Sequence, residues 1–275
     1  MKQSIFTIVS NEALTDVVYK MVLSGDTSAI TNCGQFVDLR LPEKYQRRPI
    51  SVCDYDGETL TLIYKVVGSG TEIMASLPAA TRLDVLTGLG NGYDTTLSGQ
   101  RPVLVGGGVG VPPMYNLCKK LIAEGKEPQV VLGFNTAAEI FLADEFKALG
   151  AEVHIATADG SVGTRGFVTD VLKNLSYTYF YSCGPMPMFR AMEHVMTTQG
   201  QYSFEERMGC GFGACMGCTI RPEMATSGSA RTAPYSIVRR FSDEHQSESV
   251  RHRAGQSRDP RLRHLRLRQG VLRAL

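Results

Sequence analysis

Apolar and polar residues alternate along several short segments of the first 97 residues. Alternation with a period of two is typical of strands that bury one face, and joints rich in glycine, proline and asparagine separate the segments. Several short strands of this kind favour an antiparallel barrel. The predicted strands are residues 4–10, 17–25, 34–41, 59–67 and 82–88.

The pattern changes after Arg101, where apolar runs alternate with segments of helical spacing. Strand and helix in alternation predict a doubly wound parallel sheet. The predicted strands lie within 102–110, 128–134, 151–157 and 177–184, and the predicted helices within 114–125, 137–150, 166–175 and 186–200. The sequence therefore predicts a β-barrel domain at 1–97, an α/β domain at 98–200, a cysteine loop at 201–222 and a separate tail at 223–275.

Two motifs in the barrel region suit an anionic cofactor. Arg48 to Ser51 (RPIS) stand at the end of a predicted strand, where an arginine can hold a phosphate and a serine hydroxyl can reach a flavin edge. The strand with Ile63 to Lys65 closes on Gly68, Gly70 and Thr71, a compact turn whose amides can face a pyrophosphate. A surface arginine and a plain β-turn are the alternatives for each motif alone.

Two glycine motifs in the α/β region suit a dinucleotide. The first, VGGGVGVPP at 105–113, follows a strand and opens a helix, so its backbone can approach a bound diphosphate. It departs from the G-x-G-x-x-G fingerprint because Val111 replaces the last glycine. The second, CGPMPM at 183–188, ends the last predicted strand, where a purely structural turn is the alternative.

Cys210, Cys215 and Cys218 form a C-x4-C-x2-C frame, the most specific motif of the chain. This spacing is that of plant-type [2Fe–2S] proteins, which need a fourth thiolate. Zinc is the alternative, but structural zinc sites usually add a second distant pair of ligands, and the sequence has none. The other four cysteines lie singly in apolar or turn contexts, where small core residues are expected.

Length and composition favour a soluble protein of about two domains, since the chain has 275 residues and is 43% hydrophobic. No apolar run is long enough for a membrane span, and the N-terminus lacks a signal-peptide pattern. Seven cysteines without export features favour reduced thiols. We therefore expect a cytoplasmic protein with neither a membrane nor a nucleic acid as its partner.

In their order and separations, RPIS, IYK with GSGT, GGGVG, CGPMPM and EERMGCGFGACMGC resemble the electron transfer subunits of dihydroorotate dehydrogenase B, which are ferredoxin reductase-like flavoproteins. The resemblance runs from the N-terminus to about Pro222. It implies FAD in the barrel, NAD on the α/β domain, and a [2Fe–2S] cluster on Cys210, Cys215, Cys218 and one further cysteine. The candidate FAD residues are Arg48, Pro49, Ile50, Ser51, Ile63, Tyr64, Lys65, Gly70 and Thr71, and the candidate NAD residues are Gly106, Gly107, Gly108, Gly110, Cys183, Gly184 and Pro185.

The resemblance also implies a partner, because in that family this subunit does not oxidise dihydroorotate itself. A separate FMN-containing catalytic subunit, in a heterotetramer with two copies of each chain, passes electrons through the cluster to FAD and on to NAD+ in pyrimidine biosynthesis. We expect no catalytic acid or base in this chain, since the cofactors carry the chemistry. The alternatives are an NAD(P)H–ferredoxin reductase or sulfide dehydrogenase subunit, and a cluster-deficient module that only binds FAD and NAD.

The tail lacks the fourth cysteine, and it holds 11 arginines but no lysine. Family members continue with a segment resembling Lys-Arg-Val-Cys-Lys-Asp-Gly-Pro-Val-Phe. Reading the last base of each codon with the first two of the next allows this whole segment across residues 226–236, with cysteine where Ser229 precedes Ala230 and a stop where Ser242 precedes Asp243. We therefore interpret 223–275 as disordered, out-of-frame translation after a slip near Arg221 to Met224. A genuine basic interaction arm is the alternative.

Overall fold

The computed structural model describes residues 1–42, 44–204 and 208. All of these residues belong to one compact unit. Of the predicted cysteine loop at 201–222, only residues 201–204 and 208 are described; its three cysteines, the codon-shift region and the basic tail lie outside the described residues.

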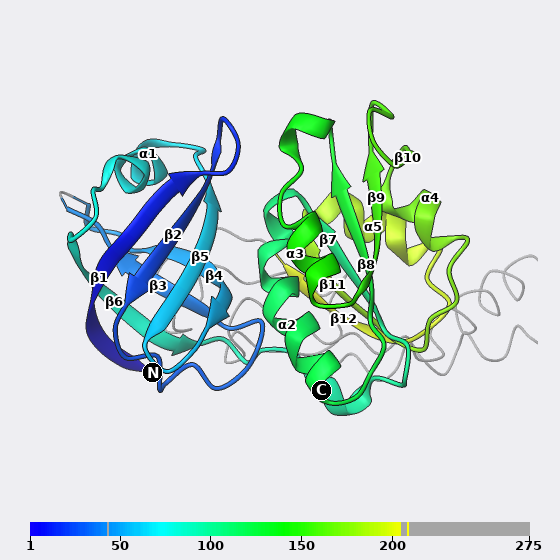
Figure 1. Ribbon diagram of the computed structural model, residues 1–275, viewed down its shortest axis with the longest axis horizontal. Helices are drawn as coiled ribbons and strands as arrows, with labels where there is room; N and C mark the ends of the chain where they lie inside the picture. The colour runs from blue at the N-terminus through cyan, green and yellow to red at the C-terminus, as the bar shows by residue number, and fades with distance from the viewer. Residues whose placement is uncertain (43, 205–207, 209–275) are drawn as a thin grey trace, which may run out of the picture. The chain divides into compact units, whose positions relative to one another are not determined.

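The first part of the described chain is a closed barrel (Figure 1). Its strands follow the spatial order β1-β2-β5-β4-β3-β6, and every neighbouring pair is antiparallel. The interior is filled by the buried residue of each alternating pair, such as Phe6, Leu62 and Val85. The strands are β1 (Lys2–Ala13), β2 (Val18–Ser24), β3 (Phe36–Arg40), β4 (Arg48–Tyr55), β5 (Thr59–Lys65) and β6 (Arg82–Leu89).

Two details of the barrel differ from the sequence prediction. The RPIS motif begins strand β4 instead of ending a strand, which suits Pro49 because proline is tolerated near the start of a strand. The residues predicted as a compact turn after β5 form the first turn of a short helix, α1 (Ser69–Ser76). Thr71 fixes this start, because its Oγ1 accepts the backbone N–H groups of Val67 at 2.9 Å and Gly68 at 3.2 Å.

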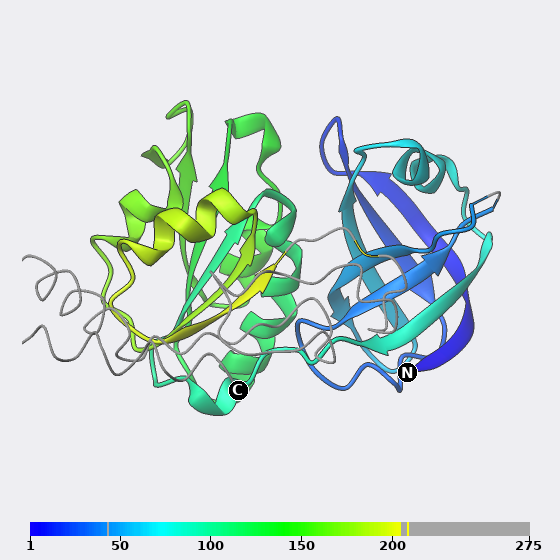
Figure 2. The ribbon, with the colours of Figure 1, turned by 180° about the vertical axis from the view of Figure 1, so that it is seen from behind.

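The second part is a parallel sheet in the order β10-β9-β8-β7-β11-β12. Helices α2 and α3 cover one face, and α4 and α5 cover the other (Figures 1 and 2). The strands are β7 (Val103–Gly107), β8 (Gln129–Phe134), β9 (Glu152–Thr157), β10 (Thr164–Arg165), β11 (Phe180–Gly184) and β12 (Gly200–Phe204). The helices are α2 (Pro112–Ala123), α3 (Ala143–Ala148), α4 (Val168–Leu172) and α5 (Met186–Glu193), with 3-10 turns η1 (Thr95–Leu97), η2 (Gly108–Gly110) and η3 (Ala137–Glu139).

The predicted fold class, a barrel followed by a parallel α/β domain, is confirmed. The predicted helix at 137–150 is shorter, because Leu142 adopts a left-handed conformation (φ 62°) that separates η3 from α3. Strand β12, in the stretch that the sequence analysis divided between the last helix and the cysteine loop, pairs with β11 instead.

The two parts share a polar contact and a continuous core. Asp54 of β4 accepts hydrogen bonds from Asn116 Nδ2 at 2.9 Å and from Lys119 Nζ at 2.6 and 2.8 Å, both on α2. Buried residues of the barrel, among them Val18 and Ile63, join the same apolar cluster as Leu117 of α2. No helix in the described part of the chain is long and apolar enough to cross a membrane.

Candidate functional site

A cation lies against the start of helix α1 in the barrel. A Cβ built on Gly70 would stand 2.0 Å from Nε of Arg48 and 2.6 Å from its Cζ, so the guanidinium lies directly against this glycine. Nη1 of Arg48 donates to the carbonyls of Gln46 at 2.9 Å and Arg47 at 3.1 Å, which fixes the orientation of the side chain. Because a helix N-terminus carries partial positive charge, guanidinium and helix start together make an anion-binding site.

The residues around this anion site are neither fully buried nor fully exposed. Arg48, Pro49, Ile50 and Ser51 are all of intermediate exposure, whereas the following Val52 and Cys53 are buried. These four half-buried residues leave part of their surface accessible to a ligand. The diphosphate and isoalloxazine ring of FAD therefore fit this half of the barrel.

The glycine turn after β7 is shaped by close packing at one residue and by an open cavity at another. A Cβ on Gly110 would stand 2.1 Å from the carbonyl oxygen of Cys183, so only glycine fits between the two strand ends. Gly108 instead has φ +53° and nothing within 4 Å of a built Cβ. The predicted NAD motifs at 106–110 and 183–185 are thus in contact, and Gly108 keeps the space beside them open.

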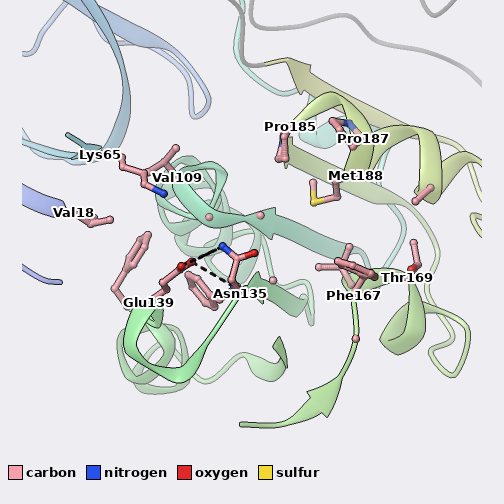
Figure 3. A pocket seen from close by; sticks show the side chains of 18 of the residues that line it. Val18, Lys65, Val109, Asn135, Glu139, Phe167, Thr169, Pro185, Pro187 and Met188 are labelled. Carbon is pink, nitrogen blue, oxygen red and sulfur yellow. Dashed lines mark hydrogen bonds between the residues drawn. The ribbon is translucent and has the colours of Figure 1, made fainter. Parts of the chain in front are cut away.

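A cavity of about 590 Å³ lies beside this turn. Figure 3 shows Lys65 and Val18 on the barrel side, Pro185 and Met188 near the end of β11, and Phe167 and Thr169 at the opposite end. The lining is mainly apolar with a few polar groups, as is usual for cofactor sites. An extended dinucleotide, with one end directed to the barrel, fits its shape and its position at the carboxyl ends of parallel strands.

Phe167 and Glu139 are among the residues lining this cavity that the sequence analysis did not predict. Phe167 is 67% exposed and lines it beside α4, and Glu139 lines it after β8. Glu139 is held by Asn135, whose Nδ2 donates to its two carboxylate oxygens at 2.9 and 3.1 Å (Figure 3). The acidic position after the second strand of a dinucleotide fold could have indicated Glu139, whereas no sequence signal distinguished an exposed phenylalanine from a core one.

A buried carboxylate lies on the strand next to RPIS. Asp38 is opposite Pro49 in the β3–β4 register and is only 2% exposed. Burial raises the pKa of Asp38 to about 6, although Arg47 and Arg48 act to lower it. This acid therefore prefers its neutral form in the folded protein more than an exposed aspartate does.

The four described cysteines, Cys33, Cys53, Cys118 and Cys183, are buried and free of disulfides, as expected for core residues. Burial raises the pKa of the Cys33 thiol to about 11 and that of Cys118 to about 12. Within residues 1–42, 44–204 and 208, no cluster of histidine, cysteine and acidic side chains could hold a metal. Cys210, Cys215 and Cys218 lie outside the described residues.

Met208 is the described residue nearest in sequence to the cysteine loop. It packs against the pair of buried residues Phe36 and Leu89 on β3 and β6. Phe36 is directly opposite Ser51 in the β3–β4 register. Met208 thus lies beside the strand that neighbours the RPIS motif, two residues before Cys210 in the sequence.

Two family profiles match the chain. The oxidoreductase NAD-binding domain matches residues 104–194, and the iron-sulfur cluster binding domain of dihydroorotate dehydrogenase B matches residues 205–232. The electron transfer subunit of dihydroorotate dehydrogenase B (NAD+) from Fusobacterium nucleatum is 43% identical over 237 residues, covering 80% of this chain and 90% of that protein. That from Bacillus pumilus is 42% identical over 234 residues, covering 81% and 90%.

The chain belongs to this family of electron transfer subunits. Among solved structures, an NADH-dependent reduced ferredoxin-NADP oxidoreductase that performs flavin-based electron bifurcation is similar, with a TM-score of 0.69 and 28% identity over 76% of this chain and 79% of that one. A ferredoxin NADP+ reductase from Neisseria gonorrhoeae, with a TM-score of 0.63 and 18% identity over 74% of this chain and 98% of that one, shares the fold. The family resemblance predicted from the motifs is confirmed.

Proposed function

We propose that this chain is the electron transfer subunit of an NAD+-linked dihydroorotate dehydrogenase. It belongs to that family over 80% of its length, and the iron-sulfur profile of the same enzyme matches the segment after β12. The observation that carries the proposal is one cavity lined both by the barrel, through Lys65, and by the glycine turn, through Gly107 and Gly108. Flavin and dinucleotide can therefore meet in it.

The barrel residues hold FAD. Arg48 and the start of α1 receive the diphosphate, and the open edge from Pro49 to Ser51 lies along the ring system. The backbone of Ile63, Tyr64 and Lys65, with Gly70 and Thr71, completes this half of the site. When bound, FAD exchanges a hydride with NAD and single electrons with the [2Fe–2S] cluster.

The α/β residues hold NAD. Gly106 to Gly110 bring the backbone close to the diphosphate; Cys183 and Gly184 pack against Gly110, and Pro185 lines the cavity. No acid or base of this chain is required, because the residues bind and orient the two cofactors and exclude water from the space between them. We assign FAD binding to residues 1–97 and NAD binding to the α/β domain from 98 through β12.

The cluster and the partner complete the relay. Cys210, Cys215 and Cys218 supply three thiolates of the [2Fe–2S] site. In the shifted reading frame, the last base of the Ser229 codon and the first two bases of the Ala230 codon encode the fourth cysteine. The family name implies a catalytic partner subunit. We assign that partner an FMN group and the complex two copies of each chain, in the cytoplasm.

A related reductase is the second candidate. The structural similarity to the bifurcating NADH-dependent ferredoxin-NADP oxidoreductase, at 28% identity, favours it, since that protein shares both parts of the described fold. The 43% identity to a dihydroorotate dehydrogenase subunit favours the first. The two candidates differ in electron donor: dihydroorotate through a partner subunit for the first, and reduced ferredoxin for the second.

Co-expression with a dihydroorotate dehydrogenase catalytic subunit tests the proposal. Two forms are compared: the chain as written, and a chain whose codons from 223 onward are read in the shifted frame. We expect the restored chain to co-purify with the partner, to bind two irons per chain, and to reduce NAD+ when dihydroorotate is added. The chain as written should keep FAD but lack a full cluster, because three thiolates leave one iron without a ligand.

Three outcomes would contradict parts of this proposal. A restored chain that binds FAD but takes electrons only from reduced ferredoxin would favour the second candidate. A chain as written with two irons per molecule would remove the need for a shifted frame. A fresh DNA sequence across the codons for Cys218 to Asp243 that confirms the present frame would leave the cluster defective in the natural protein.

A further inference from the structure

We propose that Asn11, oriented by Tyr64, is a positioning residue for the flavin: its side-chain amide fixes helix α1 on the barrel, so that the start of the helix meets the FAD diphosphate. The inference rests on the proposed function, which places that diphosphate at Arg48 and the start of α1. Asn11 belongs to β1, outside every motif that suits a cofactor. Because it contacts the end of the helix opposite to Arg48, it works through α1 and not by binding the flavin.

The amide of Asn11 caps the carboxyl end of α1, which lies at one end of the barrel (Figure 1). Its Nδ2 donates to the carbonyl of Met74 at 2.8 Å and to that of Leu77 at 3.1 Å, with a longer contact to Ala75 at 3.4 Å. Leu77 is the residue directly after the helix, and the other two belong to its last turn. The last carbonyls of a helix have no partner within the helix. One side chain of β1 therefore ties this end of α1 to the barrel wall.

Tyr64 fixes the orientation of this amide. Its hydroxyl donates to Oδ1 of Asn11 at 2.9 Å. Since carbonyl groups only accept, the amide nitrogen must face the helix and the amide oxygen must face Tyr64. Burial raises the pKa of Tyr64 to about 12, although the hydrogen bond to Asn11 acts to lower it, so the hydroxyl keeps its proton at neutral pH.

The side chain of Tyr64 lies in the barrel core and is only 2% exposed. Its ring stacks on that of Tyr19, with the ring centroids 6.0 Å apart. A ligand outside the barrel cannot reach this ring. Tyr64, which the sequence analysis grouped with the flavin residues, therefore acts on the flavin through Asn11 and α1 as far as its side chain is concerned.

Helix α1 needs such support because it is short. It has eight residues, about two turns, and isolated helices of this length are unstable in water. Its position therefore depends on contacts with the barrel. Thr71 fixes its start, Met74 is buried in the barrel core, and Asn11 holds its carboxyl end. Over only two turns, a loss at one end also displaces the start beside Arg48.

The expected consequence is specific to one part of the ligand. If α1 occupies the binding position for only a fraction of the time, the affinity for a ligand that needs α1 falls by that fraction. FAD carries the diphosphate that the start of α1 receives, whereas riboflavin has the same ring system and no phosphate. A loss of Asn11 should therefore weaken FAD and spare riboflavin.

The test is titration of the full-length apoprotein with FAD and with riboflavin, followed by fluorescence quenching. Three variants are compared with the parent: Asn11→Ala, Tyr64→Phe and the matched control Asn174→Ala. Nδ2 of Asn174 donates to the carbonyl of Asp170 in α4 at 3.1 Å, so the control removes the same kind of hydrogen bond away from the barrel. Hydrogen exchange of the backbone amides of 69–77 gives a second measurement on the same proteins.

We expect Asn11→Ala to bind FAD about fivefold to fiftyfold more weakly, the usual effect of losing one or two hydrogen bonds. Tyr64→Phe keeps the amide but not its orientation, so its loss should be smaller, about threefold to tenfold. Riboflavin affinity should stay at the parent level in both, and Asn174→Ala should change neither ligand. In the Asn11→Ala apoprotein the amides of 69–77 should exchange faster, and saturating FAD should restore their protection.

Two results overturn the assignment. One is an Asn11→Ala protein that binds FAD as tightly as the parent, and the other is an equal loss of FAD and riboflavin affinity, which would give Asn11 a general structural role. If Asn11→Ala does not fold, Tyr64→Phe decides by the same two criteria. Arg48→Gln separates this inference from the proposed function. If Arg48→Gln also binds FAD like the parent, the proposed diphosphate site at α1 fails, whereas a loss in Arg48→Gln alone refutes only the role of Asn11.

Discussion

The N-termini of helices α1 and α2 are both candidate anion-binding sites, but they are built from different groups. Both follow a strand end, β5 and β7, and both begin close to glycine residues. At α1 the guanidinium of Arg48 lies against Gly70, so charge and helix start come from the same barrel. At α2 the first two residues are prolines without an N–H group, and Lys65, the one cationic side chain among the described residues that line the cavity, belongs to the barrel.

The two candidate sites depend on different properties of the chain. The site at α1 depends on the charge of Arg48 close to the backbone, and all of its residues belong to the barrel. The site at α2 depends on shape, because Gly110 lets two strand ends approach and Gly108 leaves the cavity open. The cavity proposed for the dinucleotide is lined by residues of both the barrel and the α/β domain.

Replacing Gly110 by alanine should have the largest effect on stability. The new Cβ would stand 2.1 Å from a backbone oxygen, which cannot rotate away, so two strand ends must separate. We expect a loss of about 3 kcal/mol in the free energy of unfolding, measured by urea denaturation. Gly57→Ala, where nothing lies within 4 Å of the new Cβ, is the matched control and should be near neutral. Equal stability of the two variants would show that shape is not what limits the α2 site.

Replacing Arg48 by glutamine should act on flavin binding rather than on folding. The side chain stays polar but becomes shorter and loses the charge beside α1, so FAD affinity should fall about tenfold to a hundredfold. Apoprotein titrated with FAD by fluorescence quenching gives the dissociation constants. If the variant binds FAD as tightly as the parent, charge is not what the α1 site supplies, and the comparison with α2 fails.

Replacing Asp38 by asparagine should reveal the cost of burying a carboxylate in the barrel. The pKa of Asp38 in the folded protein is raised to about 6 from an ordinary 3.8, so the folded state favours its protonated form. The stability contributed by that proton is present below pH 4 and is lost as the pH rises from about 4 to about 6. Above pH 6 the variant should be more stable than the parent by about 1–2 kcal/mol.

Thermal midpoints of the Asp38→Asn variant and the parent at pH 4 and pH 7.5 check this sign. The midpoint of the variant relative to the parent should rise between the two pH values. A constant difference across this range would mean that Asp38 does not titrate there.

Replacing Gly108 by alanine should give a smaller change in stability than replacing Gly110. Its φ of +53° is unfavourable for alanine by about 1 kcal/mol, but the new methyl group meets no atom within 4 Å. Urea denaturation should therefore show a smaller loss than for Gly110→Ala, although the two glycines are two residues apart. A loss as large as that of Gly110→Ala would indicate that the turn tolerates no side chain at either position.

The sequence by itself determined the division into a barrel and a parallel α/β domain. Short segments with a hydrophobic period of two give way to apolar runs that alternate with segments of helical spacing, and this change is a local signal. It also determined the family, since the cysteine frame and the glycine motifs are short contiguous stretches. The single left-handed residue Leu142, which shortens the helix at 137–150, carries no such signal. Neither does the start of a helix at Ser69 where a turn was predicted.

Only the tertiary structure decided which residues of different strands face one another. The contact of Arg48 with Gly70, the approach of Gly110 to Cys183, and the entry of Lys65 into the cavity of the other domain all join positions far apart in sequence. A motif gives the residue type at a strand end, but the register and packing of the strands determine where its side chain points. For this reason the sequence analysis grouped Lys65 with a flavin motif, whereas in the fold Lys65 lines the cavity beside the glycine turn.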